Sequence, residues 1–179
     1  MKAVKILIVN LITAMRGASI FFLAYLLSIH YLAALGLVAV FALSDKVDGW
    51  LAGYWNAQTK FGAFFDPFVD KVFYLGGLFL LTSLVQPLGE IFRQTFWPEF
   101  SLVIIRIPPL DKKLGIQPPA TQYGKFKMGC QSFALIEILL GLLLRRPDII
   151  TTGIYIAWGC IFLSFLSFYS HFEDPLKTA

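Results

Sequence analysis

Six long apolar stretches account for most of this chain, and they constrain its fold more than any other feature. They cover roughly residues 6–29, 32–53, 62–85, 88–107, 124–145 and 149–170. A helix needs about 20 mainly apolar residues to cross a bilayer. With 58% hydrophobic and 15% charged residues, a soluble domain of this size could not bury so much apolar surface. The sequence therefore predicts an all-α, polytopic membrane protein: one domain over residues 1–179, built as a bundle of six transmembrane helices.

The positively charged residues predict the orientation of this bundle. Lysine and arginine concentrate in the cytoplasmic loops of membrane proteins. If the N-terminus faces the cytoplasm, only Arg145 and Arg146 fall clearly on the far side. The cytoplasmic set is then Lys2, Lys5, Lys60, Lys112, Lys113, Lys125 and Lys177. We expect both termini to face the cytoplasm.

Four carboxylates within 26 residues mark the candidate site: Asp45, Asp48, Asp66 and Asp70. Members of the first pair are three residues apart and those of the second four apart, so each pair lies on one face of its helix. A short turn joins the two helices, which lets the faces converge into a polar cavity near the cytoplasmic end. An ionised side chain at membrane depth costs at least a few kcal/mol, and divalent cations would neutralise the cluster. Hard cations such as Mg²⁺ prefer oxygen ligands.

The chain resembles the CDP-alcohol phosphotransferase family. The family motif is matched in residue type and spacing by Asp45, Asp48, Gly49, Ala52, Gly62, Asp66 and Asp70. The number of helices and the chain length are also similar, so the resemblance covers nearly the whole chain. Further features are similar to the bacterial phosphatidylglycerophosphate synthases of this family. They are Asn10-Leu-Ile-Thr13 with Arg16, Asp66-Pro67, Asp70-Lys71, and Gly124-Lys-Phe-Lys127 with Gln131.

The resemblance implies a role for each matching residue. Two divalent ions, Mg²⁺ or Mn²⁺, would be held by Asp45, Asp48 and Asp66, with Asp70 as a bridging ligand. Asp70 would also be the catalytic base that takes the proton from the incoming alcohol. The cytidine diphosphate moiety would lie against Gly49, Ala52 and Gly62.

Three basic residues are candidates for binding the phosphate of an acceptor: Lys125, Arg16 and Arg106. Each also has a simpler interpretation, because basic side chains near helix ends often reach toward lipid headgroups. Two positions depart from the family pattern. Gly53 stands where the family usually has arginine, and Pro98-Glu99 aligns loosely with an Arg-Glu pair. Fewer guanidinium groups would weaken the hold on phosphates or indicate a less anionic acceptor.

The resemblance implies that the protein is an enzyme, a CDP-alcohol phosphatidyltransferase in the bacterial inner membrane with its active site facing the cytoplasm. It would transfer a phosphatidyl group from CDP-diacylglycerol to a small alcohol, most readily glycerol 3-phosphate, and release CMP. Phosphatidylglycerol, inositol phosphate and serine are alternative acceptors. An intramembrane prenyltransferase is disfavoured because both aspartate pairs share one helical hairpin. A transporter with buried carboxylates is a non-enzymatic alternative. Homodimers occur in the family, membrane lipids are the expected surroundings, and no nucleic-acid partner is expected.

Overall fold

The computed structural model describes residues 2–55, 60–105 and 122–173, and along parts of the helices, including residues 45–53, it describes the backbone alone. Within these ranges all regular structure is helical, which confirms the predicted all-α class. The six helices are α1 (Lys2–Ile29), α2 (Tyr31–Tyr54), α3 (Lys60–Leu81), α4 (Leu88–Ile105), α6 (Gln122–Leu144) and α7 (Pro147–Glu173).

Two described boundaries lie four residues from the apolar pattern: α1 begins at Lys2 rather than at residue 6, and α3 ends early. The pattern predicted a helix to residue 85, whereas α3 ends at Leu81 and turns follow. The hydroxyl groups of Thr82 and Ser83 donate to the backbone carbonyls of Phe79 and Leu80, at 2.7 and 2.9 Å. Such local bonds compete with the helical ladder and favour turns. The chain therefore leaves the helix before Pro87, although Leu84 and Val85 are apolar.

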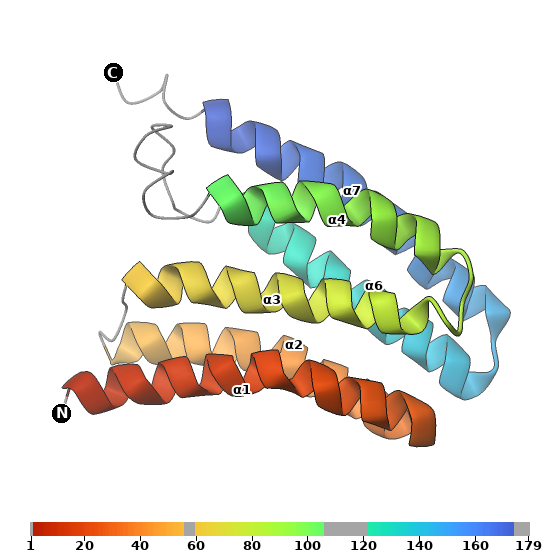
Figure 1. The fold of residues 1–179 in the computed structure, drawn as a ribbon, viewed down its shortest axis with the longest axis horizontal. Helices are drawn as coiled ribbons and strands as arrows, with labels where there is room; N and C mark the ends of the chain where they lie inside the picture. The colour runs from red at the N-terminus through yellow and green to blue at the C-terminus, as the bar shows by residue number, and fades with distance from the viewer. Residues whose placement is uncertain (1, 56–59, 106–121, 174–179) are drawn as a thin grey trace.

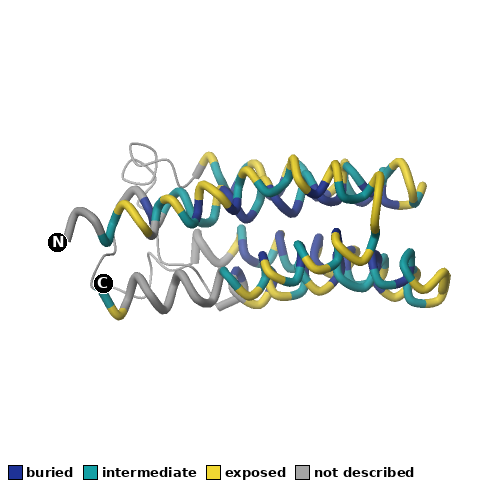
Figure 2. The backbone as a smooth tube through the Cα atoms, turned by 90° about the horizontal axis from the view of Figure 1, so that it is seen from below, coloured by how far each residue is buried: buried dark blue, intermediate teal, exposed yellow. Residues whose placement is uncertain are grey.

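The helices form a closed ring in two layers. α1 packs on α2 and α3, α2 packs on α6, and α6 packs on α7; α4 completes the ring by packing between α7 and α3. Figure 1 shows α1, α3 and α4 in front of α2, α6 and α7, and Figure 2 shows the two layers from the side. A contact between α3 and α6 links the layers across the centre. α3 touches α1, α4 and α6, so its inward-facing side chains can contact three other helices.

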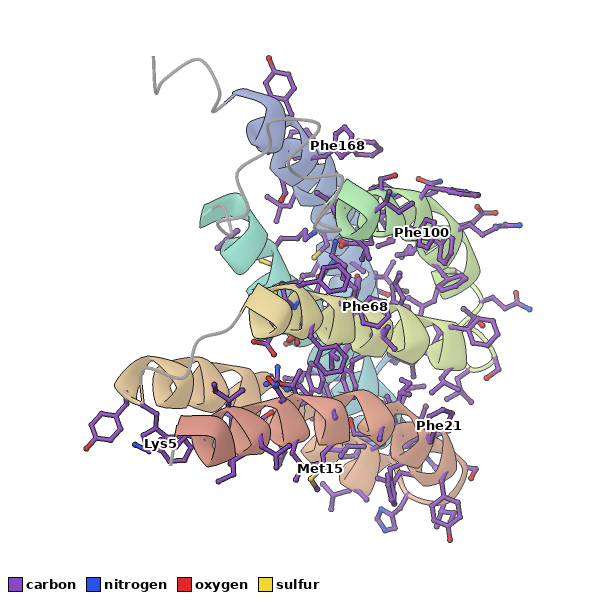
Figure 3. The ribbon with its side chains drawn as sticks, turned by 60° about the vertical axis from the view of Figure 1, so that its left-hand side comes forward. Lys5, Met15, Phe21, Phe68, Phe100 and Phe168 are labelled. Atoms are coloured by element: carbon purple, nitrogen blue, oxygen red, sulfur yellow. The ribbon has the colours of Figure 1, made fainter. Side chains whose placement is uncertain are left out.

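The outer surface of the bundle is apolar. Among the described residues, α1, α6 and α7 are long and apolar enough to cross a membrane, over Lys5–Ile29, Phe126–Leu144 and Pro147–Tyr169. Large apolar side chains such as Met15 and Phe21 on α1 are more than 60% exposed (Figure 3). Charged side chains such as Arg16 and Glu99 are buried instead. A protein with apolar groups outside and ionic groups inside is suited to a lipid environment. The chain is an integral membrane protein.

A tight turn joins α6 to α7 and brings these two helices very close. Arg145 has a positive φ of 54°, and the amide of Arg146 donates to the carbonyl of Gly141 at 2.9 Å. This geometry is that of a Schellman helix end, which normally places glycine at the left-handed position. Gly141 of α6 and Gly153 of α7 lie where these two helices cross. A methyl group added at either position would meet an atom of the opposite helix within 3 Å.

Candidate active site

The centre of the candidate site is the face of α3 that carries Asp66 and Asp70. α1 supplies partners to both carboxylates. The hydroxyl of Thr13 donates to Oδ1 of Asp66 at 2.8 Å, and Nη1 of Arg16 donates to Oδ1 of Asp70 at 3.1 Å. Thr13 and Arg16 are three residues apart and the aspartates four apart, so the two pairs lie one above the other along adjacent helices. The spacing predicted this shared face correctly for the α3 pair.

Arg16 is held deep in the bundle. Its side chain is 3% exposed, and its guanidinium carbon lies 5.5 Å from the centre of the Phe41 ring of α2. Arginine over an aromatic face is attracted by the negative charge of the π system. Phe41 in turn stacks on Phe73 of α3, with ring centres 3.5 Å apart. Arg16 therefore lies where α1, α2 and α3 meet, and its predicted role in binding an acceptor phosphate stays a prediction.

Several predicted site residues have side chains that lie outside the described part of the structure. Asp45, Asp48, Gly49 and Ala52 belong to the last turns of α2, where only the backbone is described. The side chain of Lys125, in the first turn of α6, and the whole of Arg106 lie outside the described residues. Gly62 is described and is buried in the first turn of α3. The convergence of four carboxylates on one cavity, and the assigned roles of all these residues, therefore remain predictions.

The donor chemistry of the described part fits a hard divalent cation. Asp66 and Asp70 present carboxylate oxygens one helical turn apart, and oxygen is the ligand that Mg²⁺ and Mn²⁺ prefer. Among the side chains that the structure describes, no three His, Cys, Asp or Glu residues form a group that could hold a metal. A complete ligand set therefore requires further residues, and Asp45 and Asp48 are the predicted ones.

A second buried polar group, which we call the Glu99 cluster, lies one helix further along the ring. Glu99 on α4 is fully buried. Its Oε1 lies 2.7 Å from Nζ of Lys127 on α6 and accepts bonds of 2.8 Å from Gln131 on α6 and from Ser164 on α7. Lys71 on α3 approaches Oε2 to 3.4 Å and donates to the Glu99 carbonyl at 3.0 Å. Glu99, Lys71, Lys127, Gln131 and Ser164 thus tie four helices together.

Sequence reasoning did not find this cluster. It named Lys127 and Gln131 only as part of the resemblance to the synthases, and Glu99 only as part of a loosely aligned pair. The usable signal was a charge near the middle of a transmembrane helix, as at Lys71 and Glu99, because such residues are rare and nearly always have partners inside the bundle.

An apolar groove of about 440 Å³ opens between α4 and α7, lined by residues that include Trp97, Pro98, Phe165 and Phe168. In Figure 3, Phe168 marks its α7 side. Asp66 and Asp70 are not among its lining residues. The groove is therefore separate from the described carboxylates of the candidate active site.

Comparison with known proteins gives consistent matches. A family model described as CDP-alcohol phosphatidyltransferase matches residues 6–166. A protein of Pectobacterium atrosepticum, named CDP-diacylglycerol–glycerol-3-phosphate 3-phosphatidyltransferase, is 31% identical over 170 residues, covering 92% of this chain and 90% of that protein. Proteins with the same name from Sodalis glossinidius and Aquifex aeolicus are 30% and 32% identical. The first match covers 74% of this chain and 70% of the relative, the second 65% of each.

Proposed function

This chain belongs to the CDP-alcohol phosphatidyltransferase family, and we propose that it transfers a phosphatidyl group from CDP-diacylglycerol to glycerol 3-phosphate. Membership of the family makes the chain a transferase. The observation that carries the choice of substrates is the similarity to relatives named for this reaction, one of which matches over nearly its whole length.

In the proposed reaction the acceptor hydroxyl attacks the phosphorus that bears diacylglycerol. A new P–O bond forms to the acceptor, and the bond from phosphorus to the oxygen that bridges to CMP breaks. CMP leaves with that oxygen, and the hydroxyl proton passes to the carboxylate of Asp70. A positioned carboxylate base of this kind accelerates such a step by about 100-fold to 10,000-fold.

Asp45, Asp48, Asp66 and Asp70 would together hold two divalent cations. The bound cations would neutralise the diphosphate and stabilise the charge that develops on the departing CMP. The stack of Phe41 on Phe73 supports this ligand set, because it is a direct side-chain contact between α2 and α3. Asp45 follows Phe41 by one helical turn and Asp70 precedes Phe73 by nearly one turn, so the two aspartates belong to neighbouring levels of α2 and α3.

Partners on α1 would orient the two described carboxylates before substrate arrives. Arg16 holds one oxygen of Asp70 and Thr13 holds one oxygen of Asp66. Because each bond comes from a buried or half-buried side chain, neither carboxylate rotates freely. Gly49, Ala52 and Gly62 would lie against the nucleotide, where small residues allow close approach of a ligand to the backbone. Lys125 and Arg106 would bind the acceptor phosphate.

We further propose that the active site faces the cytoplasm in a bacterial inner membrane. Figure 1 supports a single active end of the bundle, because the start of α1, the start of α3 and the end of α4 lie at the same end. Lys2 and Lys5 at the start of α1 and Lys60 at the start of α3 belong to this end, consistent with the positive-inside rule. A homodimer remains a proposal from the family alone.

The choice of acceptor is tested by offering the purified protein CDP-diacylglycerol and a panel of alcohols in detergent. The panel contains glycerol 3-phosphate, phosphatidylglycerol, inositol phosphate and serine, with one sample that has no acceptor. We expect CMP release and phosphatidylglycerophosphate, identified by mass, in the glycerol 3-phosphate sample, and no CMP release after EDTA treatment. A different lipid product would show that another alcohol is the acceptor. Activity that persists in EDTA would contradict the metal-dependent mechanism.

A further inference from the structure

The Glu99 cluster needs a reason beyond stability. Taking charges out of water costs several kcal/mol per ion, and a well-packed apolar replacement is often neutral or stabilising. Glu99 and Lys127 are almost fully buried, with side chains 0% and 4% exposed. Charged residues inside a transmembrane bundle usually serve the function of the protein. The Glu99 cluster is therefore expected to affect the candidate active site.

The cluster connects to the candidate active site through Lys71. Lys71 follows Asp70 directly, so the two side chains leave α3 about 100° apart around the helix axis. Asp70 points to Arg16 of α1, whereas Lys71 points to Glu99 of α4. α3 is thus held by polar contacts on two sides. Glu99 is itself held by the ion pair with Lys127 of α6, and it also accepts a bond from Ser164 of α7.

We propose that Glu99 is a positioning residue: through Lys71 it sets the rotation of α3 about its own axis, and so the direction in which Asp66 and Asp70 present their carboxylates. This inference deepens the proposed function and rests on it for the role of the two aspartates.

The geometry makes such a role quantitatively reasonable. A helix with its side chains has a radius of about 6 Å, so a rotation of about 10° moves a carboxylate by about 1 Å. Misplacement of a reacting or ligating group by about 1 Å can cost about 100-fold in rate. A contact that prevents α3 from rotating by such an angle can therefore affect the site without touching the substrate.

The rotation of α3 can be measured directly by disulfide formation between α1 and α3. An ideal Cβ at Gly17 would lie 3.5 Å from a methyl group of Val69, so Gly17→Cys and Val69→Cys place two thiols within bonding range. Cys130→Ser and Cys160→Ala remove the native thiols from this background. We expect Lys71→Met to slow formation of the 17–69 disulfide by about threefold or more, because the bond tolerates little displacement.

A matched control separates positioning from general loosening of the bundle. Ser164→Ala removes a 2.8 Å bond to Glu99 from the α7 side but leaves the contact with Lys71. We expect it to lower the melting temperature without slowing the crosslink. Lys71→Arg, which keeps the charge and donors, is expected to restore crosslinking to near the unsubstituted rate. If Lys71→Met does not fold, Glu99→Gln removes the charge that attracts Lys71 but keeps the backbone carbonyl that accepts its bond, and we expect it too to slow the crosslink.

The functional consequence is measured as Mn²⁺ affinity, from the EPR signal of free Mn²⁺ over the full-length protein without substrate. We expect Lys71→Met to weaken binding by about tenfold or more, the usual effect of losing an outer-shell support, and Ser164→Ala to leave it unchanged. Equal crosslinking rates in Lys71→Met and its parent would overturn the proposal, as would an equal loss in Ser164→Ala. Absence of Mn²⁺ binding in the parent protein would count against the proposed metal site alone, since the crosslinking result stands independently of it.

Discussion

Because α6 and α7 cross closely at Gly141, we expect Gly141→Ala to destabilise the protein. A methyl group at position 141 would lie 2.6 Å from Cγ1 of Ile150 and 2.8 Å from its backbone nitrogen, and 3.1 Å from the carbonyl oxygen of Arg146. Two of these three atoms belong to the backbone, so a change of rotamer cannot relieve the contact. The start of α7 would have to move away from α6.

The expected magnitude follows from two opposing terms. Overpacking a close contact typically costs 1–3 kcal/mol, and the backbone contact here favours the upper part, about 3 kcal/mol. Replacing glycine by alanine inside a helix returns up to about 1 kcal/mol. The net loss is about 2 kcal/mol, which corresponds to about 4–8 °C in melting temperature for a chain of this size.

The measurement is thermal unfolding in detergent, followed by tryptophan fluorescence. Gly159→Ala on α7 and Gly129→Ala on α6 are matched controls, because an added Cβ at either position meets nothing within 4 Å. These two variants should keep or raise the melting temperature. If Gly141→Ala melts at or above the temperature of the unsubstituted protein, α6 and α7 do not cross as closely as described.

Three further predictions concern the α6–α7 turn and the candidate site. Arg145→Gly should raise stability by about 1 kcal/mol, because glycine adopts a positive φ without strain; an unchanged melting temperature would show that the turn differs. Asp70→Asn should lower CMP release by about 100-fold or more while Mn²⁺ binding stays measurable, and full activity would show that another group is the base. Arg16→Met should destabilise the protein by about 3 kcal/mol, because it leaves the buried Asp70 carboxylate without this partner. The double variant Arg16→Met with Asp70→Asn should recover part of that loss, and strict additivity of the two single effects would contradict the pairing.

The helical layout was predictable because the bilayer imposes a length on every apolar stretch. The predicted stretches 6–29 and 149–170 correspond to α1 and α7 within a few residues. The end of α3 was not predictable from hydropathy, because Thr82 and Ser83 are small and mildly polar residues that a membrane helix tolerates. Their effect comes from hydrogen bonds to backbone carbonyls, which depend on local geometry rather than on polarity.

The candidate site was predictable only in part. The spacing of Asp66 and Asp70 is enough to place them on one face, since helical periodicity is local. Whether Arg16 reaches that face or the lipid depends on how α1 packs on α3, and a single sequence carries no information on that packing. The same limit hid the Glu99 cluster, whose hydrogen-bonding partner Ser164 is 65 residues away along the chain.

The Glu99 cluster also bears on how the chain enters the bilayer during synthesis. Transmembrane segments leave the ribosome in chain order, so α3 and α4 emerge before α6. Lys71 and Glu99 carry opposite charges, so their contact lowers the cost of placing both inside the hairpin that α3 and α4 form. Lys127 comes later, near the start of α6, and finds Glu99 already in place as a partner, which lowers the cost of burying its ammonium group. The chain order thus places Glu99 after Lys71 and before Lys127, so the carboxylate is available to both lysines when α6 is inserted.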